Sequence, residues 1–114
     1  MRLVNITNGA TLADDIEEAL SHSQRRKGLL GRDSLEPGAG LCFPRCRQVH
    51  TFGMRFPIDV LFIDRDGKLI RSCSGLEPGR LSPLVPRSRN VVELPSGTCE
   101  TTGTHPGHTL ELLL

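Results

Sequence analysis

Residues 58–63 read Ile-Asp-Val-Leu-Phe-Ile, followed by Asp-Arg-Asp-Gly at 64–67 and Lys-Leu-Ile-Arg at 68–71. Two β-forming runs separated by a turn of this composition predict an antiparallel β-hairpin with a four-residue turn. Alternate residues of a strand face opposite sides of its sheet, and both faces of 58–63 are apolar after Asp59. We therefore expect an interior strand in which Val60 and Phe62 are almost fully buried.

The stretches on either side of the hairpin also alternate or cluster as strands do. Short strands are expected at 3–6, 41–43, 90–94 and 109–113, with a short turn of helix between Gly97 and Gly103. The order of elements predicts an α+β fold class, mostly β, with a small barrel-like curled sheet and one helix packed against it. We expect residues 1–114 to form a single domain.

Two other segments are harder to interpret. Residues 11–30 fit one long helix by local pattern, because Thr11 and Asp14 resemble a helix start and Ile16 and Leu20 lie four apart. A second helix start is possible at Ser21. Residues 74–90 show neither a helical nor a strand period, and so long a connection is usually a functional flap or a disordered segment.

Composition excludes several classes of protein. The chain has 114 residues, with 14 basic against 13 acidic side chains, which argues against a main role in binding nucleic acid or anionic lipid. The longest apolar run, Val60–Ile63, is far too short to span a membrane. The N-terminus has no apolar region of the kind that directs secretion, so we expect the four cysteines to be reduced and the protein to be cytoplasmic.

Asp59 is the first candidate functional residue, because it is the only acid in an otherwise apolar strand. A buried carboxylate without a partner costs several kcal/mol, so we expect Asp59 to be paired with Arg55, Arg32 or backbone amides. Two roles remain open at this point. The carboxylate either organises a turn by accepting backbone N–H bonds or takes part in ligand binding or catalysis.

His50 and Thr51 precede Phe52-Gly53-Met54-Arg55, and an extended chain here would point His50, Phe52 and Met54 to one side. His50 also follows Cys42 and Cys46 at intervals of four. Zinc ligation or a Cys-His nucleophile pair is conceivable, but the spacing lacks the common C-x-x-C and includes a proline. We expect no metal and no cofactor. The common nucleotide-binding, zinc-protease and α/β-hydrolase motifs do not occur in the sequence.

Three blocks of sequence carry a resemblance to a known family: Gly28-Leu29-Leu30-Gly31-Arg32, then the run from His50 to Asp64, then Val92-Glu93-Leu94-Pro95-Ser96-Gly97. Together they resemble the domain-of-unknown-function family 192 of small prokaryotic proteins, over residues 12–113. The resemblance implies a mostly-β barrel-like fold without an established activity. It also implies that 11–19 is a strand, with the helix confined to about 21–30.

We interpret the chain as a small domain that binds a small molecule or a partner protein at one end of the sheet. The candidate ligand-binding residues are Arg32, His50, Thr51, Arg55 and Asp59. One alternative is a hydrolase- or transferase-like enzyme that uses His50 and Asp59 as acid and base. Another is a purely structural accessory module. Neither nucleic acid nor a membrane is expected as a partner.

Overall fold

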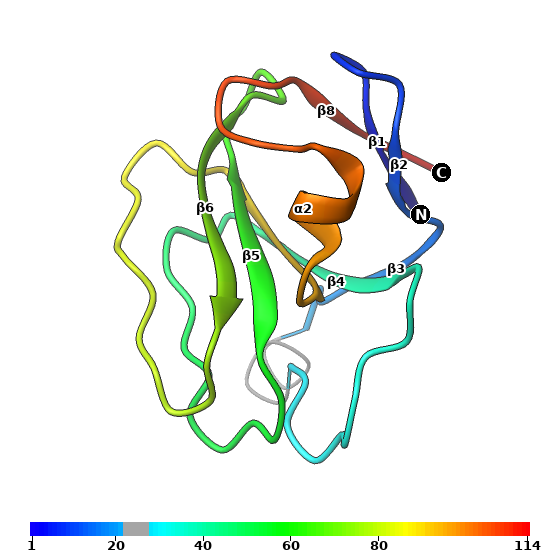
Figure 1. The fold of residues 1–114 in the computed structure, drawn as a ribbon. Helices are drawn as coiled ribbons and strands as arrows, with labels where there is room; N and C mark the ends of the chain where they lie inside the picture. Colours follow the sequence, from blue (N-terminus) through cyan, green and yellow to red (C-terminus); the bar gives the residue numbers. More distant parts are fainter. Residues whose placement is uncertain (22–27) are drawn as a thin grey trace.

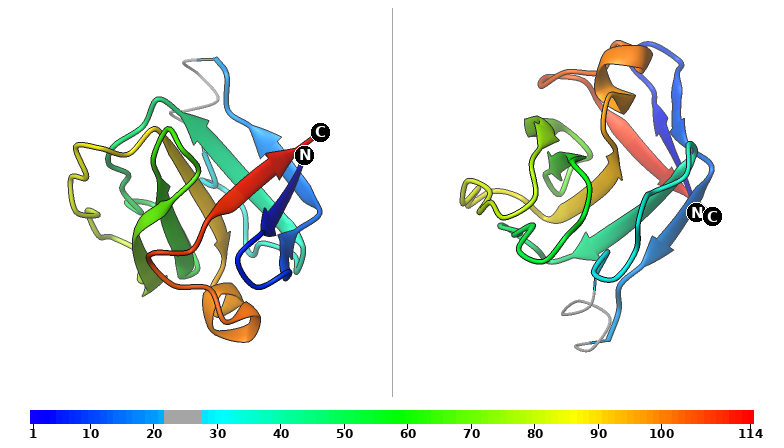
Figure 2. Two further views of the ribbon diagram at one scale, coloured as in Figure 1. Left: turned by 90° about the horizontal axis from the view of Figure 1, so that it is seen from above. Right: turned by 60° about the horizontal axis from the view of Figure 1, so that its bottom comes forward.

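The structure, a computed structural model, describes residues 1–21 and 28–114 and contains two β-sheets (Figure 1). In the three-stranded sheet, β1 (Arg2–Asn5) lies between β2 (Thr11–Ala13) and β8 (Leu110–Leu113), antiparallel to both. Because β1 and β8 are paired, the two chain ends lie side by side (Figure 2). Both sheets curl without closing into one barrel, so the expected mostly-β, curled α+β architecture is confirmed.

The larger sheet has five strands in the order β3-β4-β7-β5-β6. Its members are β3 (Asp15–Glu18), β4 (Ala39–Pro44), β5 (Ile58–Ile63), β6 (Leu69–Leu76) and β7 (Asn90–Pro95). The β3–β4 pair is parallel and the other pairs are antiparallel. The helix α2 (Thr98–Thr102) follows β7 directly, as the sequence predicts.

The central hairpin is confirmed. β5 pairs with β6 and with β7, so it is an interior strand, and Val60 and Phe62 are 0% exposed. The turn closes when the amide of Gly67 donates to the carbonyl of Asp64, with Gly67 at φ 85°. That left-handed conformation favours glycine. β6 runs on to Leu76, so the expectation of no regular structure was wrong for residues 74–76.

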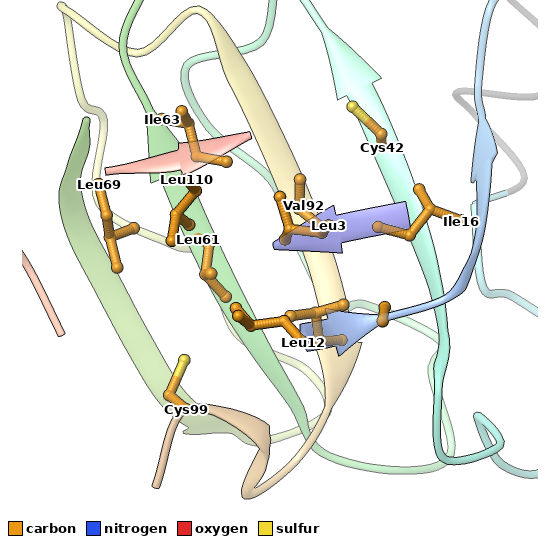
Figure 3. Packing of buried hydrophobic residues seen from close by; sticks show 12 residues of the cluster. Leu3, Leu12, Ile16, Cys42, Leu61, Ile63, Leu69, Val92, Cys99 and Leu110 are labelled. Carbon is orange, nitrogen blue, oxygen red and sulfur yellow. The ribbon is translucent and has the colours of Figure 1, made fainter. Parts of the chain in front are cut away.

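The two faces of the five-stranded sheet cover separate cores. The first core lies between the two sheets and takes Leu61 and Ile63 from β5, together with Leu3, Leu12 and Leu110 of the smaller sheet (Figure 3). The second core takes the alternate residues of β5, and loop residues close over it. Its members from β5 are Ile58, Val60 and Phe62, and its loop members include Leu29, Leu35, Met54 and Val85. The side chains of β5 that the sequence predicts on opposite faces of the strand are therefore divided between the two cores.

A long helix over 11–30 was wrong, because 11–18 forms β2 and β3 in two different sheets. The strand that the family resemblance implied is confirmed in this shorter, broken form. Ile16 packs in the first core while Leu20 is 72% exposed, so these two residues share no helical face. The expected helix over 21–30 falls largely on 22–27, which lie outside the described residues, and 28–31 form turns.

Candidate functional site

Asp59 is held by backbone amides rather than by an arginine. Its side chain is 0% exposed. One carboxylate oxygen, Oδ1, accepts N–H bonds from Gly75 at 2.9 Å and Gly97 at 3.3 Å, and Oδ2 accepts one from Cys99 at 2.9 Å. These bonds tie the end of β6 and the start of α2 to β5. A small hollow of about 260 Å³ lies beside the carboxylate, between β6 and the turn before α2.

Asp59→Asn is expected to lower the free energy of unfolding by about 2 kcal/mol, because a buried donor is left without an acceptor. The amide oxygen can keep two of the bonds, but the NH₂ group then faces the N–H of Cys99, and both groups are donors. Urea melts of the variant and the wild type measure the difference. A change below about 0.5 kcal/mol would contradict this role of the carboxylate.

Thr51 fastens the loop before β5 to the connection that follows β6. It is 0% exposed, and its hydroxyl donates to the carbonyl of Glu77 at 2.6 Å and accepts from the amide of Arg80 at 2.9 Å. Its own amide donates to the carbonyl of Arg80 at 2.8 Å, and its carbonyl accepts from Gly79 at 2.9 Å. Every one of these bonds is made with backbone, so the side chain of Thr51 fixes the loop in place.

His50 and Phe52 form an exposed pair of stacked rings. Their ring centres are 4.9 Å apart with 19° between the planes, and Phe52 is 50% exposed. Leu81, which is 60% exposed, pairs with His50 through a β-bridge. The extended conformation considered for this segment is not adopted. A turn at Phe52-Gly53, with Gly53 at φ 80°, sends Met54 into the second core instead.

The two candidate arginines make exposed ion pairs. Nη1 of Arg55 lies 2.7 Å from Oδ1 of Asp33, and Nη2 of Arg32 lies 3.6 Å from Oε2 of Glu17. Such surface pairs contribute little to stability, so both guanidinium groups are available to a ligand at small cost. Arg32 also lines a hollow of about 420 Å³ together with Glu17 and Leu41.

Four of the five candidate residues lie on loops, Arg32 between β3 and β4 and the other three between β4 and β5. The segments 28–34 and 50–57 of these loops run at the lower end of Figure 1. A Cβ atom on Gly53 would lie 3.2 Å from Cδ2 of Leu30. The loop that carries His50, Thr51 and Arg55 is therefore in contact with the segment that carries Arg32. Asp59 is the second residue of β5, which begins at this end, but its carboxylate points to the opposite face of the sheet, beside α2. Within the described residues, no hydrogen bond joins Asp59 to His50.

Glu93 is a second buried acid that the sequence reasoning missed. It sits in the middle of β7, only 3% exposed, between Leu41 of β4 and Val60 of β5. Burial raises the pKa of its carboxyl to about 8. No hydrogen bond or ion pair to this carboxyl is found in the part of the chain that the structure describes. The signal that marked Asp59, one acid in a strand apolar on both faces, would also have marked Glu93.

The cysteines are all free thiols, and burial raises the pKa of Cys42 and of Cys99 to about 12. At Cys99 the negative charge of Asp59 acts in the same direction as burial. Within residues 1–21 and 28–114, no three His, Cys, Asp or Glu side chains gather as metal ligands do. No helix of these residues is long and apolar enough to cross a membrane.

These features define a class of protein, a small α+β domain of two curled sheets. At one end of it, a loop that is held by the hydrogen bonds of Thr51 displays two exposed rings. The sequence matches the family described as DUF192, "Uncharacterized ACR", over residues 3–112, and the chain belongs to that family. The family has no established activity. No curated protein matches the sequence significantly.

Two solved structures are similar to the chain. One, from Sinorhizobium meliloti 1021, is described as a candidate transcription regulator; it is 29% identical, with a TM-score of 0.79, over 96% of this chain and 89% of that one. The other, a protein of unknown function from Novosphingobium aromaticivorans DSM 12444, is 21% identical, with a TM-score of 0.83. This match covers 97% of this chain and 82% of that one, and it shows the fold alone.

Proposed function

We propose that this protein is a binding domain that recognises a small molecule or a partner protein through the exposed end formed by His50, Phe52, Arg55 and Leu81. The observation that carries the proposal is the stacked His50–Phe52 pair, exposed to solvent on a loop with a fixed backbone. Exposed rings and leucines are costly in water and are typical of contact surfaces. The end surface, as we call these four residues, offers a ligand apolar contact beside a cation.

The rigidity of the loop supports recognition. Thr51 lies between the two rings in sequence and binds backbone groups of residues 77–80, so the loop pays little ordering entropy when a ligand docks. Arg32, on the adjoining segment, extends the same end with a second cation. Thr51 thus serves the site as a positioning residue rather than as a contact.

The geometry gives less support to an enzyme that uses His50 and Asp59. Both carboxylate oxygens of Asp59 already accept backbone N–H bonds. His50 lies on an exposed loop, and its Nδ1 accepts a hydrogen bond from the amide of Phe52 at 3.2 Å. A general acid and base must reach the same reacting atoms. A role through binding also agrees with the description of the S. meliloti protein as a candidate regulator.

We further propose that the protein works in the cytoplasm and that residues 1–114 act as one domain. Four free thiols in a chain of this size support a reducing compartment.

Native mass spectrometry of freshly purified protein, followed by a thermal-shift screen against a metabolite library, tests the proposed function. We expect a bound mass or a stabilising compound with the wild type, and its loss in Phe52→Ala. Ile6→Ala is the matched control, since Ile6 is a 54% exposed apolar residue on the turn after β1. Absence of any ligand, or equal loss in both variants, would contradict the proposal.

A further inference from the structure

Asn5, the last residue of β1, lies at the centre of a hydrogen-bond network. Its side chain is 0% exposed, and its Oδ1 accepts the amides of Thr7 at 3.0 Å and Asn8 at 3.3 Å. Backbone amides can only donate, so these two bonds fix which end of the Asn5 side chain is the oxygen. The NH₂ group therefore points to the segment between α2 and β8. There it donates to Oγ1 of Thr104 at 3.1 Å and lies 2.9 Å from Nδ1 of His108.

This contact determines where the neutral ring of His108 carries its proton. The NH₂ group of Asn5 can only donate, so Nδ1 of His108 accepts and the ring proton is on Nε2. A second proton would go to Nδ1 and would place an N–H group against the N–H of Asn5. Asn5 cannot turn its oxygen to the ring without giving up the amides of Thr7 and Asn8. Protonation of His108 therefore breaks its bond with Asn5.

A second histidine lies against the first. The ring centres of His105 and His108 are 3.9 Å apart, with 44° between the planes. Nδ1 of His105 lies 3.1 Å from the carbonyl oxygen of Pro106, which can only accept, so Nε2 of His105 is the nitrogen that takes a second proton. Two charged rings at this distance repel each other. Acid therefore weakens the arrangement at both rings.

The other charged groups near His108 do not offset this effect through direct contacts. The turn between β1 and β2, residues 6–10, carries no titratable side chain. On the other elements around His108, which are α2, β8 and the β5–β6 turn with the start of β6, the charged side chains are Asp64, Arg65, Asp66, Lys68, Glu100 and Glu111. Within the described residues, no hydrogen bond or ion pair joins any of these side chains to the ring of His108.

The same network holds two segments of the chain together. Nδ2 of Asn8 donates to the carbonyl of Thr102 at 2.9 Å, and the amide of Thr109 donates to Oγ1 of Thr7 at 2.8 Å. The amide of Ile6 donates to the carbonyl of Thr109 at 2.9 Å. The turn between β1 and β2 is thus fastened to the segment 102–109, and the histidine ring supplies the part of this fastening that responds to acid.

We propose that His108 is an acid-sensitive lock, which holds the turn between β1 and β2 in place while the ring is neutral and releases it when the ring is protonated. Histidine is the side chain whose charge ordinarily changes within the physiological pH range. The lock is closed at neutral pH, because the unprotonated Nδ1 accepts the bond from Asn5, and it opens as the pH falls. The part released is one end of the three-stranded sheet, where Asn5 pairs with Leu110 of β8.

Nuclear magnetic resonance between about pH 7.5 and 5 tests the lock in the full chain. The nitrogen shifts of the His108 ring report which nitrogen carries the proton. Hydrogen-exchange protection of the amides of Thr7 and Thr109, corrected for the intrinsic effect of pH on exchange, reports whether the turn is fastened. The amide of Thr51, which donates to the carbonyl of Arg80 on other loops, is the reference for unfolding of the whole chain.

His108→Asn is the test variant, because its Oδ1 can take the place of Nδ1, accept from Asn5 and remain unprotonated at the lower pH. His50→Asn is the matched control, since it makes the same change on the loop between β4 and β5. Circular dichroism melts verify that both variants are folded.

In the wild type we expect a proton on Nε2 of His108 at the higher pH. At the lower pH, the protection of Thr7 and Thr109 should fall about tenfold relative to Thr51, which corresponds to the loss of one hydrogen bond. The control should repeat this loss, and His108→Asn should change by less than about twofold.

An equal loss in His108→Asn would overturn the proposal, as would constant protection in the wild type or absence of the loss in the control. A proton on Nδ1 of His108 at the higher pH would overturn it as well. This last measurement needs only the wild type, so it decides the matter even where the test variant does not fold.

Discussion

Raising the pH from 4.5 to 8 is expected to cost the wild type up to about 5 kcal/mol in free energy of unfolding through Glu93 alone. Burial raises the pKa of this carboxyl from 4.5 to about 8. In the unfolded chain it loses its proton near pH 4.5, whereas in the folded chain it keeps the proton until about pH 8. Each pKa unit corresponds to about 1.36 kcal/mol. Because the folded pKa is the higher one, this stabilisation is complete below pH 4.5 and is lost as the pH rises through 8.

Glu93→Gln isolates this effect, since glutamine has nearly the shape of a protonated glutamate and does not titrate. We expect the stability of the variant to lack the loss that Glu93 causes between pH 5 and 8, and therefore to exceed that of the wild type at pH 8. Urea melts over this pH range give the difference between the two proteins, in which titration of all other groups cancels. Parallel pH profiles would show that Glu93 ionises normally in the folded protein.

Phe62→Ala is expected to lower the free energy of unfolding by about 3 to 5 kcal/mol. Phe62 is 0% exposed on an interior strand and packs in the second core with Val91 and Phe43. Removing the ring costs its transfer free energy and leaves a cavity, because backbone hydrogen bonds to β6 and β7 on both sides prevent the strand from collapsing into the space. The loss is measured by urea or thermal melts.

The same substitution at Phe52 is the control, because this ring is half exposed and lies outside both cores. Phe52→Ala should cost less than about 1 kcal/mol. Phe62→Leu, which keeps most of the volume, should cost about 1 to 1.5 kcal/mol. A loss below about 1 kcal/mol for Phe62→Ala would mean that the second core does not depend on this strand.

The hairpin at 58–71 could be predicted from local sequence because its information is local. Alternating apolar residues and a Gly-containing turn decide both the strand and the division of its side chains between two cores. The burial of Asp59 followed from the same pattern. The identity of its partners did not follow, since Gly75, Gly97 and Cys99 reach it from two other segments through backbone amides that are present in any sequence.

Residues 11–18 show the opposite situation, in which the local pattern favoured a helix and the fold imposed strands. β3 gains backbone hydrogen bonds from β4, which is more than twenty residues away, and Ile16 gains burial in the first core. Local propensity differs by only a few tenths of a kcal/mol per residue, so such long-range contacts outweigh it. The family resemblance found these strands because it carries information about the whole fold.

The sequence by itself determined the mostly-β class, the interior strand with its buried acid, and the residues that could form a site. The tertiary structure alone decided which of those residues meet: it placed Arg32, His50, Thr51 and Arg55 at one end and turned Asp59 to the opposite face. The physical reason is that turns and strand periods depend on neighbours in the chain. The meeting of distant side chains depends instead on strand order and register, which are set by the burial of both cores at once.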